Sequence, residues 1–144
     1  PIDLIYPCYD EIYKNEIVKF LVKSDNDIGR LTRKKMYNIL RKSLIVFSIP
    51  SSDSSPRSVY EAIFCGCIVC ITYNQYYELL PECMKRRIII VDITQKGWFK
   101  SSITKAQKII KNEFVPDNKS LELFDQRKSF RTILKLIENY EKRI

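Results

Sequence analysis

One stretch, residues 44–72, constrains the fold more than any other part of the chain. It contains two short apolar runs rich in β-branched residues, 44–49 and 67–72, and each is typical of a strand buried on both faces. The residues between these runs carry apolar side chains at helical spacing. A strand, a helix and a second strand joined this closely predict a parallel pair of strands with a right-handed crossover.

The ends of the central helix are marked by residues that favour helix termini. Ser55 is the expected N-cap, and Pro56 follows at the first helical position. Gly66 is placed to end the helix in a left-handed conformation. The side chains expected to face the sheet are those of Val59, Ala62 and Ile63. The chain therefore reaches the second strand through a glycine turn.

The rest of the chain alternates between further strand and helix patterns. Additional strands are predicted at 2–6 and 88–93, and turns at 24–29 and 96–99. Helices are predicted at 11–23, 32–42, 101–112 and, as one helix or two, 120–143. We expect an α/β fold: a three-layer sandwich in which helices cover both faces of a Rossmann-like parallel sheet of about four strands. Residues 1–144 are expected to form a single domain of this kind.

The composition is that of a globular chain with an excess of positive charge. The sequence is 45% hydrophobic and 12% aromatic, and 25 basic and 17 acidic residues give a net charge of +8. This charge indicates either a solvated basic surface or attraction for a polyanion or a phosphate-bearing ligand. No basic run is interleaved with aromatic residues as in a nucleic-acid platform, so we expect no nucleic-acid partner.

Cysteine usage bears on the compartment and on metal binding. The chain has five cysteines and no histidine, and Cys67 and Cys70 stand in an apolar segment. An odd count of core-like cysteines favours reduced thiols and a cytoplasmic protein. A C-x-C pair with scattered single cysteines does not fit a zinc site, so no metal is expected, and a Cys-His nucleophile pair is excluded.

No apolar run approaches the roughly 20 residues of a membrane span. Because the sequence begins with Pro1 rather than Met, we expect a piece of a longer protein. A targeting segment before Pro1 would instead place the protein in the Golgi or at a membrane.

The loop that enters the central helix carries groups suited to phosphate. In open parallel sheets, ligands bind where the carboxyl ends of the strands meet the helix N-termini, which here is the loop at 51–57. Backbone N–H groups and the helix dipole favour an anion at that point. Ser54, Ser55 and Ser58 add hydroxyl donors, and Arg57 adds a planar guanidinium.

Two carboxylates flank the same helix terminus. Asp53 and Glu61 are eight residues apart, and a carboxylate can accept two hydrogen bonds from the vicinal diol of a ribose or from sugar hydroxyls. Simpler interpretations stay open. Arg57 and Glu61 have the i, i+4 spacing of a surface salt bridge, Asp53 is a common turn residue, and the serines are common caps.

The segment 51–69, SSDSSPRSVYEAIFCGCIV, resembles the donor-binding segment of GT-B fold glycosyltransferases. It is especially similar to the exostosin-like pattern, in which a serine-rich loop leads to Arg, a Glu-Ala pair, Gly-Cys and a strand. The more general pattern of retaining transferases is also similar: two carboxylates eight residues apart, then a small-Gly turn into a strand. Two positions differ from the family: the first carboxylate is Asp53 rather than Glu, and no proline follows Gly66-Cys67.

The resemblance implies roles for the residues that match the pattern. Glu61 would hold the ribose of a nucleotide-sugar such as a UDP-sugar, and Asp53 would reach the donor sugar. Arg57 and the helix N-terminus, with Ser54, Ser55 and Ser58, would face the diphosphate. No metal or other cofactor is implied. Enzymes of this class have two Rossmann-like domains, so no general base is assigned and the catalytic residues stay unknown.

The function expected from the resemblance is that of a glycosyltransferase donor-binding domain. It would be the C-terminal half of a longer enzyme, transferring a sugar to an unknown acceptor. Its partners would be a nucleotide-sugar and either a missing N-terminal acceptor domain or a carbohydrate acceptor. The alternative is a non-catalytic Rossmann-like module that binds a nucleotide, a phosphate group or a protein partner.

Overall fold

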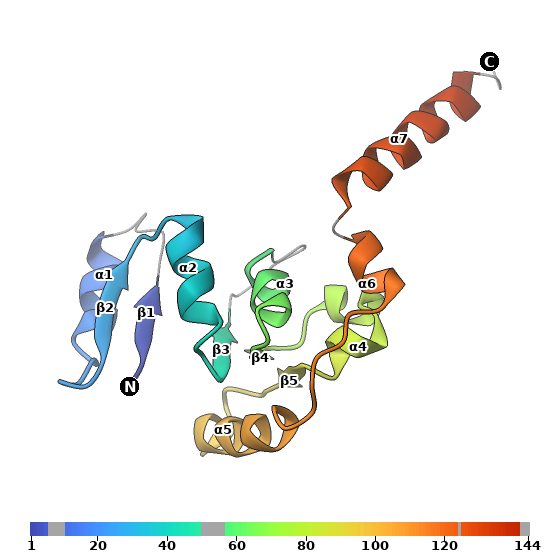
Figure 1. The fold of residues 1–144 in the computed structure, drawn as a ribbon. Helices are drawn as coiled ribbons and strands as arrows, with labels where there is room; N and C mark the ends of the chain where they lie inside the picture. Colours follow the sequence, from blue (N-terminus) through green and yellow to red (C-terminus); the bar gives the residue numbers. More distant parts are fainter. Residues whose placement is uncertain (6–10, 50–56, 124, 142–144) are drawn as a thin grey trace. The chain divides into compact units, whose positions relative to one another are not determined.

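The chain divides into two compact units, residues 1–42 and 43–144, and each is described by itself (Figure 1). The structure is a computed structural model that describes residues 1–5, 11–49, 57–123 and 125–141. Its strands are β1 Asp3–Ile5, β2 Asn26–Gly29, β3 Ile45–Ser48, β4 Ile68–Ile71 and β5 Ile88–Ile90. Its helices are α1 Glu11–Val18, α2 Arg33–Leu40, α3 Arg57–Phe64, the 3-10 helix η1 Gln75–Leu79, α4 Glu82–Lys85, α5 Trp98–Ile109, α6 Asn118–Leu123 and α7 Gln126–Glu141.

The first unit contains a small parallel sheet in which β1 pairs with β2. The prediction of a turn at 24–29 is wrong, because most of this segment forms strand β2. Its sequence is polar and ends in glycine, so it lacks the apolar pattern of a buried strand. Hydrogen bonds to the first strand hold it instead: Asn26 donates its backbone N–H to the carbonyl of Ile2 at 2.8 Å and its side-chain amide to Asp3 at 2.8 Å.

The two helices of the first unit are shorter than the sequence pattern suggests. Helix α1 ends at Val18, five residues before the predicted end. Helix α2 keeps its predicted start, because the hydroxyl of Thr32 accepts a hydrogen bond from the N–H of Lys35 at 3.4 Å. The predicted first strand at 2–6 is confirmed over Asp3–Ile5.

The second unit is built on a three-stranded parallel sheet with the order β3-β4-β5. The register places Ile45 opposite Ile68 and Val69 opposite Ile88. Every residue of β4 is buried, as expected for the central strand of a parallel sheet. The three strands predicted at 44–49, 67–72 and 88–93 are therefore confirmed as parallel neighbours.

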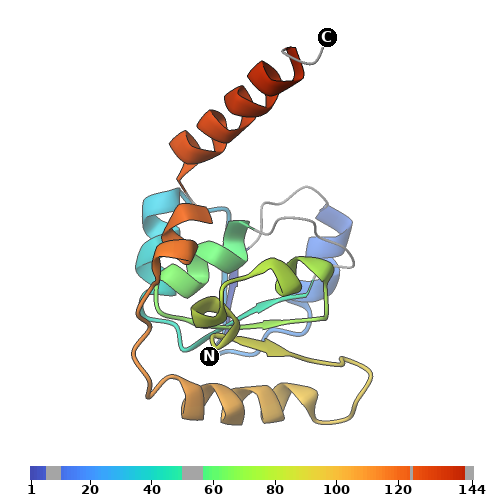
Figure 2. The same cartoon turned by 90° about the vertical axis from the view of Figure 1, so that its right-hand side faces the viewer.

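Helices cover both faces of this sheet. In Figures 1 and 2, α3 lies on one side of the strands and α5 on the other. Helix α3 buries Val59, Ala62 and Ile63, the three residues expected to face the sheet. On the opposite face, Ile68 and Cys70 belong to a core cluster with α5. Side chains alternate along a strand, so β4 supplies both cores.

The α/β class and the parallel pairing are confirmed, but the single sheet of about four strands is wrong. The described strands form one sheet of two and one of three. The strand at 2–6 was expected to join the strands of the second unit, and it pairs with β2 instead. The polar strand β2 forms the backbone hydrogen bonds of β1. The sequence of β2 has no apolar pattern that would have predicted this pairing. The prediction of a single domain over 1–144 stays a prediction.

Helix α5 begins at Trp98, three residues earlier than predicted. Gly97 adopts a φ of 83° and takes the chain from the turn into the helix. Phe47 of β3 stacks on Phe99 at 4.8 Å between ring centroids and meets the edge of Trp98 at 5.9 Å. Because of these aromatic contacts, Trp98 and Phe99, which were predicted to lie in a turn, belong to the first turn of the helix.

A buried arginine lies at the amino end of β5. Arg87, which precedes β5, is 5% exposed and donates from Nη2 to the carbonyl of Asn112. Its guanidinium lies 5.7 Å from the ring centroid of Phe114, which in turn meets the ring of Phe64 edge-on. Within the described residues, its Nη1 has no hydrogen-bond partner. Arg87 thus fixes the segment after α5 at this edge of the sheet.

Gly66 has the left-handed conformation predicted from sequence, with a φ of 94°, and nothing lies within 4 Å of a Cβ added there. Substitution by alanine therefore introduces backbone strain without a steric clash. We expect Gly66→Ala to lower the free energy of unfolding by about 1–2 kcal/mol, measured by denaturant titration. Gly66→Asn should lose less, because asparagine tolerates positive φ better. Equal losses in the two variants would contradict a cost due to strain.

Arg87→Ala removes a buried hydrogen bond and the contact with Phe114. We expect it to lower the free energy of unfolding by about 2–3 kcal/mol, whereas Arg87→Met should lose less because it fills the space without an unpaired charged nitrogen. The exposed neighbour Arg86 is the matched control, and Arg86→Ala should change stability by less than about 0.5 kcal/mol. An Arg87→Ala variant as stable as Arg86→Ala would show that this contact does not hold the sheet edge.

Candidate functional site

The candidate site lies where β3 leads into α3, and only part of it is described. All of the predicted loop at 51–57 except Arg57 lies outside the described residues, including the site residues Asp53, Ser54 and Ser55. The three remaining predicted site residues, Arg57, Ser58 and Glu61, are all on α3. The described part of the site therefore consists of the helix and the strand ends.

The edge of the sheet at the site is defined by the carboxyl ends of the strands. Because β3, β4 and β5 are parallel, they end at the same edge, at Ser48, Ile71 and Ile90. Helix α3 follows β3 and packs on β3 and β4, so its N-terminus belongs to this edge. Its first N–H groups and its dipole make this a position that favours negative charge.

The side chains of α3 divide into a core face and an outer face. Val59, Ala62 and Ile63 are completely buried against the sheet. Arg57 and Glu61 are one helical turn apart and share a face, and that face lies opposite the buried side. Arg57 is exposed at the first described position of α3, and Glu61 is half-buried.

Ser58 is also exposed in the first turn of the helix. The described structure thus brings a guanidinium, a hydroxyl and a carboxylate to the first five residues of one helix. Four residues of helix rise by about 6 Å, so Arg57 and Glu61 can contact different groups of one extended ligand.

Aromatic contacts hold α3 in position around these residues. Tyr60 meets the buried ring of Tyr76 in η1 edge-on, with 6.3 Å between the ring centroids. Phe64 meets Phe114 edge-on at 5.6 Å. Together with the three apolar residues on the sheet, these contacts fix the rotation of the helix about its axis. The outer face that carries Arg57 and Glu61 is therefore set by the core.

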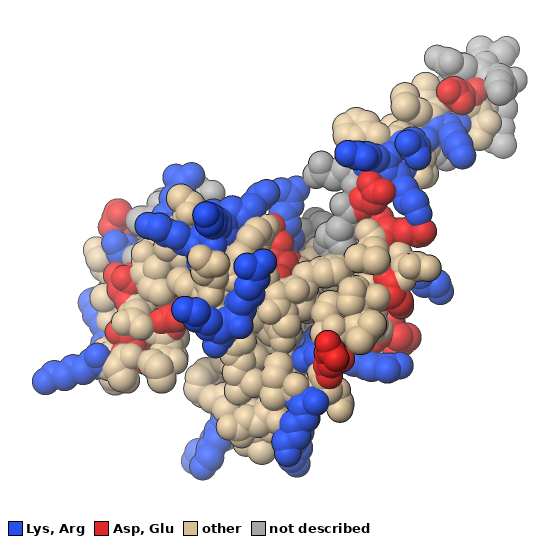
Figure 3. Space-filling model, in the orientation of Figure 1, with Lys and Arg blue, Asp and Glu red and all other residues tan. Residues whose placement is uncertain are grey.

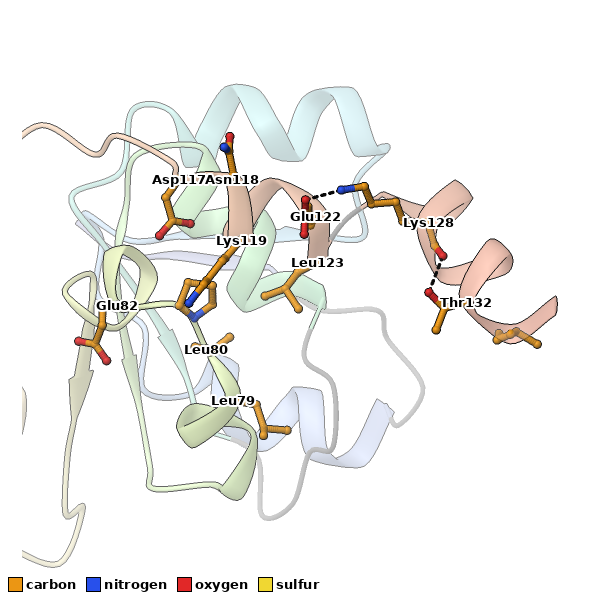
Figure 4. Close-up of a pocket in the computed structure, with 12 residues that line it drawn as sticks. Leu79, Leu80, Glu82, Asp117, Asn118, Lys119, Glu122, Leu123, Lys128 and Thr132 are labelled. Atoms are coloured by element: carbon orange, nitrogen blue, oxygen red, sulfur yellow. Dashed lines mark hydrogen bonds and ion pairs between the residues drawn. The ribbon is translucent and has the colours of Figure 1, made fainter. Parts of the chain in front are cut away.

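A second feature of this unit was not predicted from sequence. An open groove of about 1140 Å³ lies between the segment 79–82 and helices α6 and α7, and Figure 4 shows its side chains. Arg57, Ser58 and Glu61 do not line it. No local sequence signal points to it, because its walls come from segments about forty residues apart.

The groove is lined by apolar side chains and by charged side chains, two of which form an ion pair. Leu79, Leu123 and Ile133 line it. Glu122 forms an ion pair with Lys128, and Asp117 accepts the N–H of Ser120 at 2.7 Å at the start of α6. That hydrogen bond is the main cause that lowers the pKa of Asp117. These charges fix α6 and the start of α7 rather than forming a catalytic pair.

Cys67 and Cys70 have no feature of a catalytic or metal-binding site. Burial, together with the neighbouring Cys65 thiol, raises the pKa of Cys67 to about 11. Burial also raises the pKa of Cys70, whose thiol donates to the hydroxyl of Ser102 at 3.5 Å. Both thiols are protonated near neutral pH and are poor nucleophiles. Over the described ranges, no group of three or more Cys, Asp or Glu side chains is arranged to hold a metal ion.

No described helix is long and apolar enough to cross a membrane. No protein-family model, curated protein or solved structure matches the chain. The assignment of a function therefore depends on the residues and their arrangement.

The raised pKa of Cys67 makes stability depend on pH above 9. The unfolded thiol ionises near its ordinary pKa of 9.0 and the folded thiol only near 11, so ionisation favours the unfolded chain between these values. We expect the free energy of unfolding under reducing conditions to fall by up to about 2–3 kcal/mol more in the native chain than in Cys67→Ala over this range. Cys83→Ala is the control and should follow the native chain. Parallel pH profiles for the native chain and Cys67→Ala would contradict the shift.

Proposed function

We propose that this chain is the donor-binding domain of a glycosyltransferase that transfers a sugar from a nucleotide-sugar to an acceptor. The single observation that carries the proposal is the β3–α3–β4 unit. It is a parallel strand–helix–strand unit in which Arg57 lies in the first described turn of the helix and Glu61 follows one turn later on the same outer face. These are the residues and the context on which the resemblance to GT-B fold enzymes depends.

The proposed roles follow from the chemistry of each group. The diphosphate would lie against the N-terminus of α3, where Arg57 and the hydroxyl of Ser58 can donate hydrogen bonds to its oxygens. Negative charge develops on the diphosphate as the bond to the sugar breaks. The helix dipole and the guanidinium would stabilise that charge without a metal ion.

The carboxylates would hold the two ends of the donor. Glu61 would accept hydrogen bonds from the ribose diol, and its half-buried position lowers the competition from water. Asp53, in the preceding loop, would accept hydrogen bonds from the donor sugar. The acceptor and the general base would be supplied by a second domain, so catalysis is proposed for a longer protein rather than for these 144 residues alone.

Nucleotide binding tests this proposal directly. We expect UDP or GDP to bind the native chain, and Glu61→Ala to weaken the affinity by about 5- to 150-fold, the loss of roughly 1–3 kcal/mol for an abandoned charged hydrogen bond. Isothermal titration calorimetry measures both affinities. Glu113→Ala removes an exposed carboxylate elsewhere in the same unit and should leave binding unchanged.

Two further results separate the proposal from its alternative. Arg57→Ala should weaken the binding of UDP more than that of uridine, because only UDP carries the diphosphate. A thermal-shift screen should show stabilisation by nucleotide-sugars of one base. A flat response to all nucleotide-sugars would favour a phosphate-binding or partner-binding module. Unchanged affinity in Glu61→Ala would remove Glu61 from the site.

A further inference from the structure

Helix α7, Gln126–Glu141, combines a basic surface with a row of exposed apolar side chains. Helix α7 contains four basic residues, all between positions 127 and 135, and two acidic residues, Glu138 and Glu141, in its last turn. In Figure 3, blue Lys and Arg side chains follow this helix beside tan residues. The four apolar side chains of the row are between 50% and 68% exposed: Phe130, Ile133, Leu134 and Ile137.

The two kinds of side chain lie on different faces of the helix. The apolar residues recur at intervals of three and four, which places them in one stripe along the axis. The basic residues fall on the remaining surface, and all four are exposed: Arg127, Lys128, Arg131 and Lys135. Glu122 of α6 pairs with Lys128. No ion pair of the described chain involves Arg127, Arg131 or Lys135.

We propose that α7 binds the surface of a membrane rich in anionic lipids, lying in the plane of the interface with its apolar row among the acyl chains. An amphipathic helix with a basic polar face and low overall hydrophobicity is suited to this position. Like the other described helices, α7 is not long and apolar enough to cross a bilayer.

Charge complementarity selects anionic lipid as the occupant. Each basic side chain near a negatively charged leaflet strengthens binding, and the attraction extends over about one Debye length. Arg131 and Lys135 lie on the same side of the helix one turn apart. When the apolar row enters the interface, their long side chains can extend to the lipid phosphates. This proposal is independent of the proposed sugar-donor site.

Vesicle binding by the whole chain tests the proposal. We expect sedimentation with phosphatidylcholine vesicles that contain phosphatidylserine, weaker binding without phosphatidylserine, and weaker binding at high salt. The double variant Arg131→Gln/Lys135→Gln should lower the partition coefficient by about 30-fold, at about fivefold for each charge removed. The control Lys105→Gln/Lys108→Gln removes the same charge from exposed positions on α5 and should bind like the native chain.

The apolar row is tested separately. Phe130→Ser/Ile137→Ser should reduce binding by about 100-fold, at about tenfold for each side chain removed from the acyl region. Leu79→Ser, at a leucine that is 82% exposed outside α7, should have no such effect. Because all the substituted side chains are exposed, each variant is expected to fold. Circular dichroism and unfolding curves check this.

Three outcomes would overturn the proposal. One is the absence of binding to phosphatidylserine vesicles. A second is an equal loss in the α5 control, which would assign the binding to the net charge of the chain. The third is a stable dimer in light scattering that Phe130→Ser/Ile137→Ser disrupts, which would assign the apolar row to an interface between copies of the chain.

Discussion

The burial of β4 between two helices is the interaction on which the second unit depends. Ile68, Val69, Cys70 and Ile71 are at most 1% exposed, and the strand has a hydrogen-bonded neighbour on each side. Its alternating side chains supply the core under α3 and the core above α5. Because one strand serves both cores, the position of α3 on the sheet is fixed together with the strand ends. The candidate site depends on this geometry, since the buried face of α3 determines the positions of Arg57 and Glu61 on its outer face.

The sequence predicted correctly those elements that are determined by a short, local pattern of apolar residues. The three strands of the second unit are continuous β-branched runs, and such runs have few stable places other than the inside of a sheet. Gly66 was predicted because a helix that turns directly into a strand needs a residue that tolerates positive φ. The face shared by Arg57 and Glu61 follows from their spacing once the helix is known. For these elements, local pattern and tertiary structure agree.

Sequence reasoning failed where partners distant in the chain decide the structure. Strand β2 has almost no apolar residues, and its hydrogen bonds with Ile2 and Asp3 come from more than twenty residues away. The start of α5 depends on Phe47, which lies about fifty residues before Trp98. Arg87 directly follows two basic residues in sequence, yet its guanidinium is buried and contacts the carbonyl of Asn112 and the ring of Phe114. No local propensity carries this information.

Helices α3 and α7 show why periodicity alone does not identify what a helix contacts. Both have an apolar stripe and a charged face. In α3 the stripe is completely buried because two strands lie beside it, and the charged face remains on the outside. In α7 the stripe is half or more exposed, although its pattern is equally regular. An apolar stripe in water carries a free-energy cost that burial removes. The sequence shows that such a face exists, whereas the basic residues beside it indicate which kind of surface can cover it.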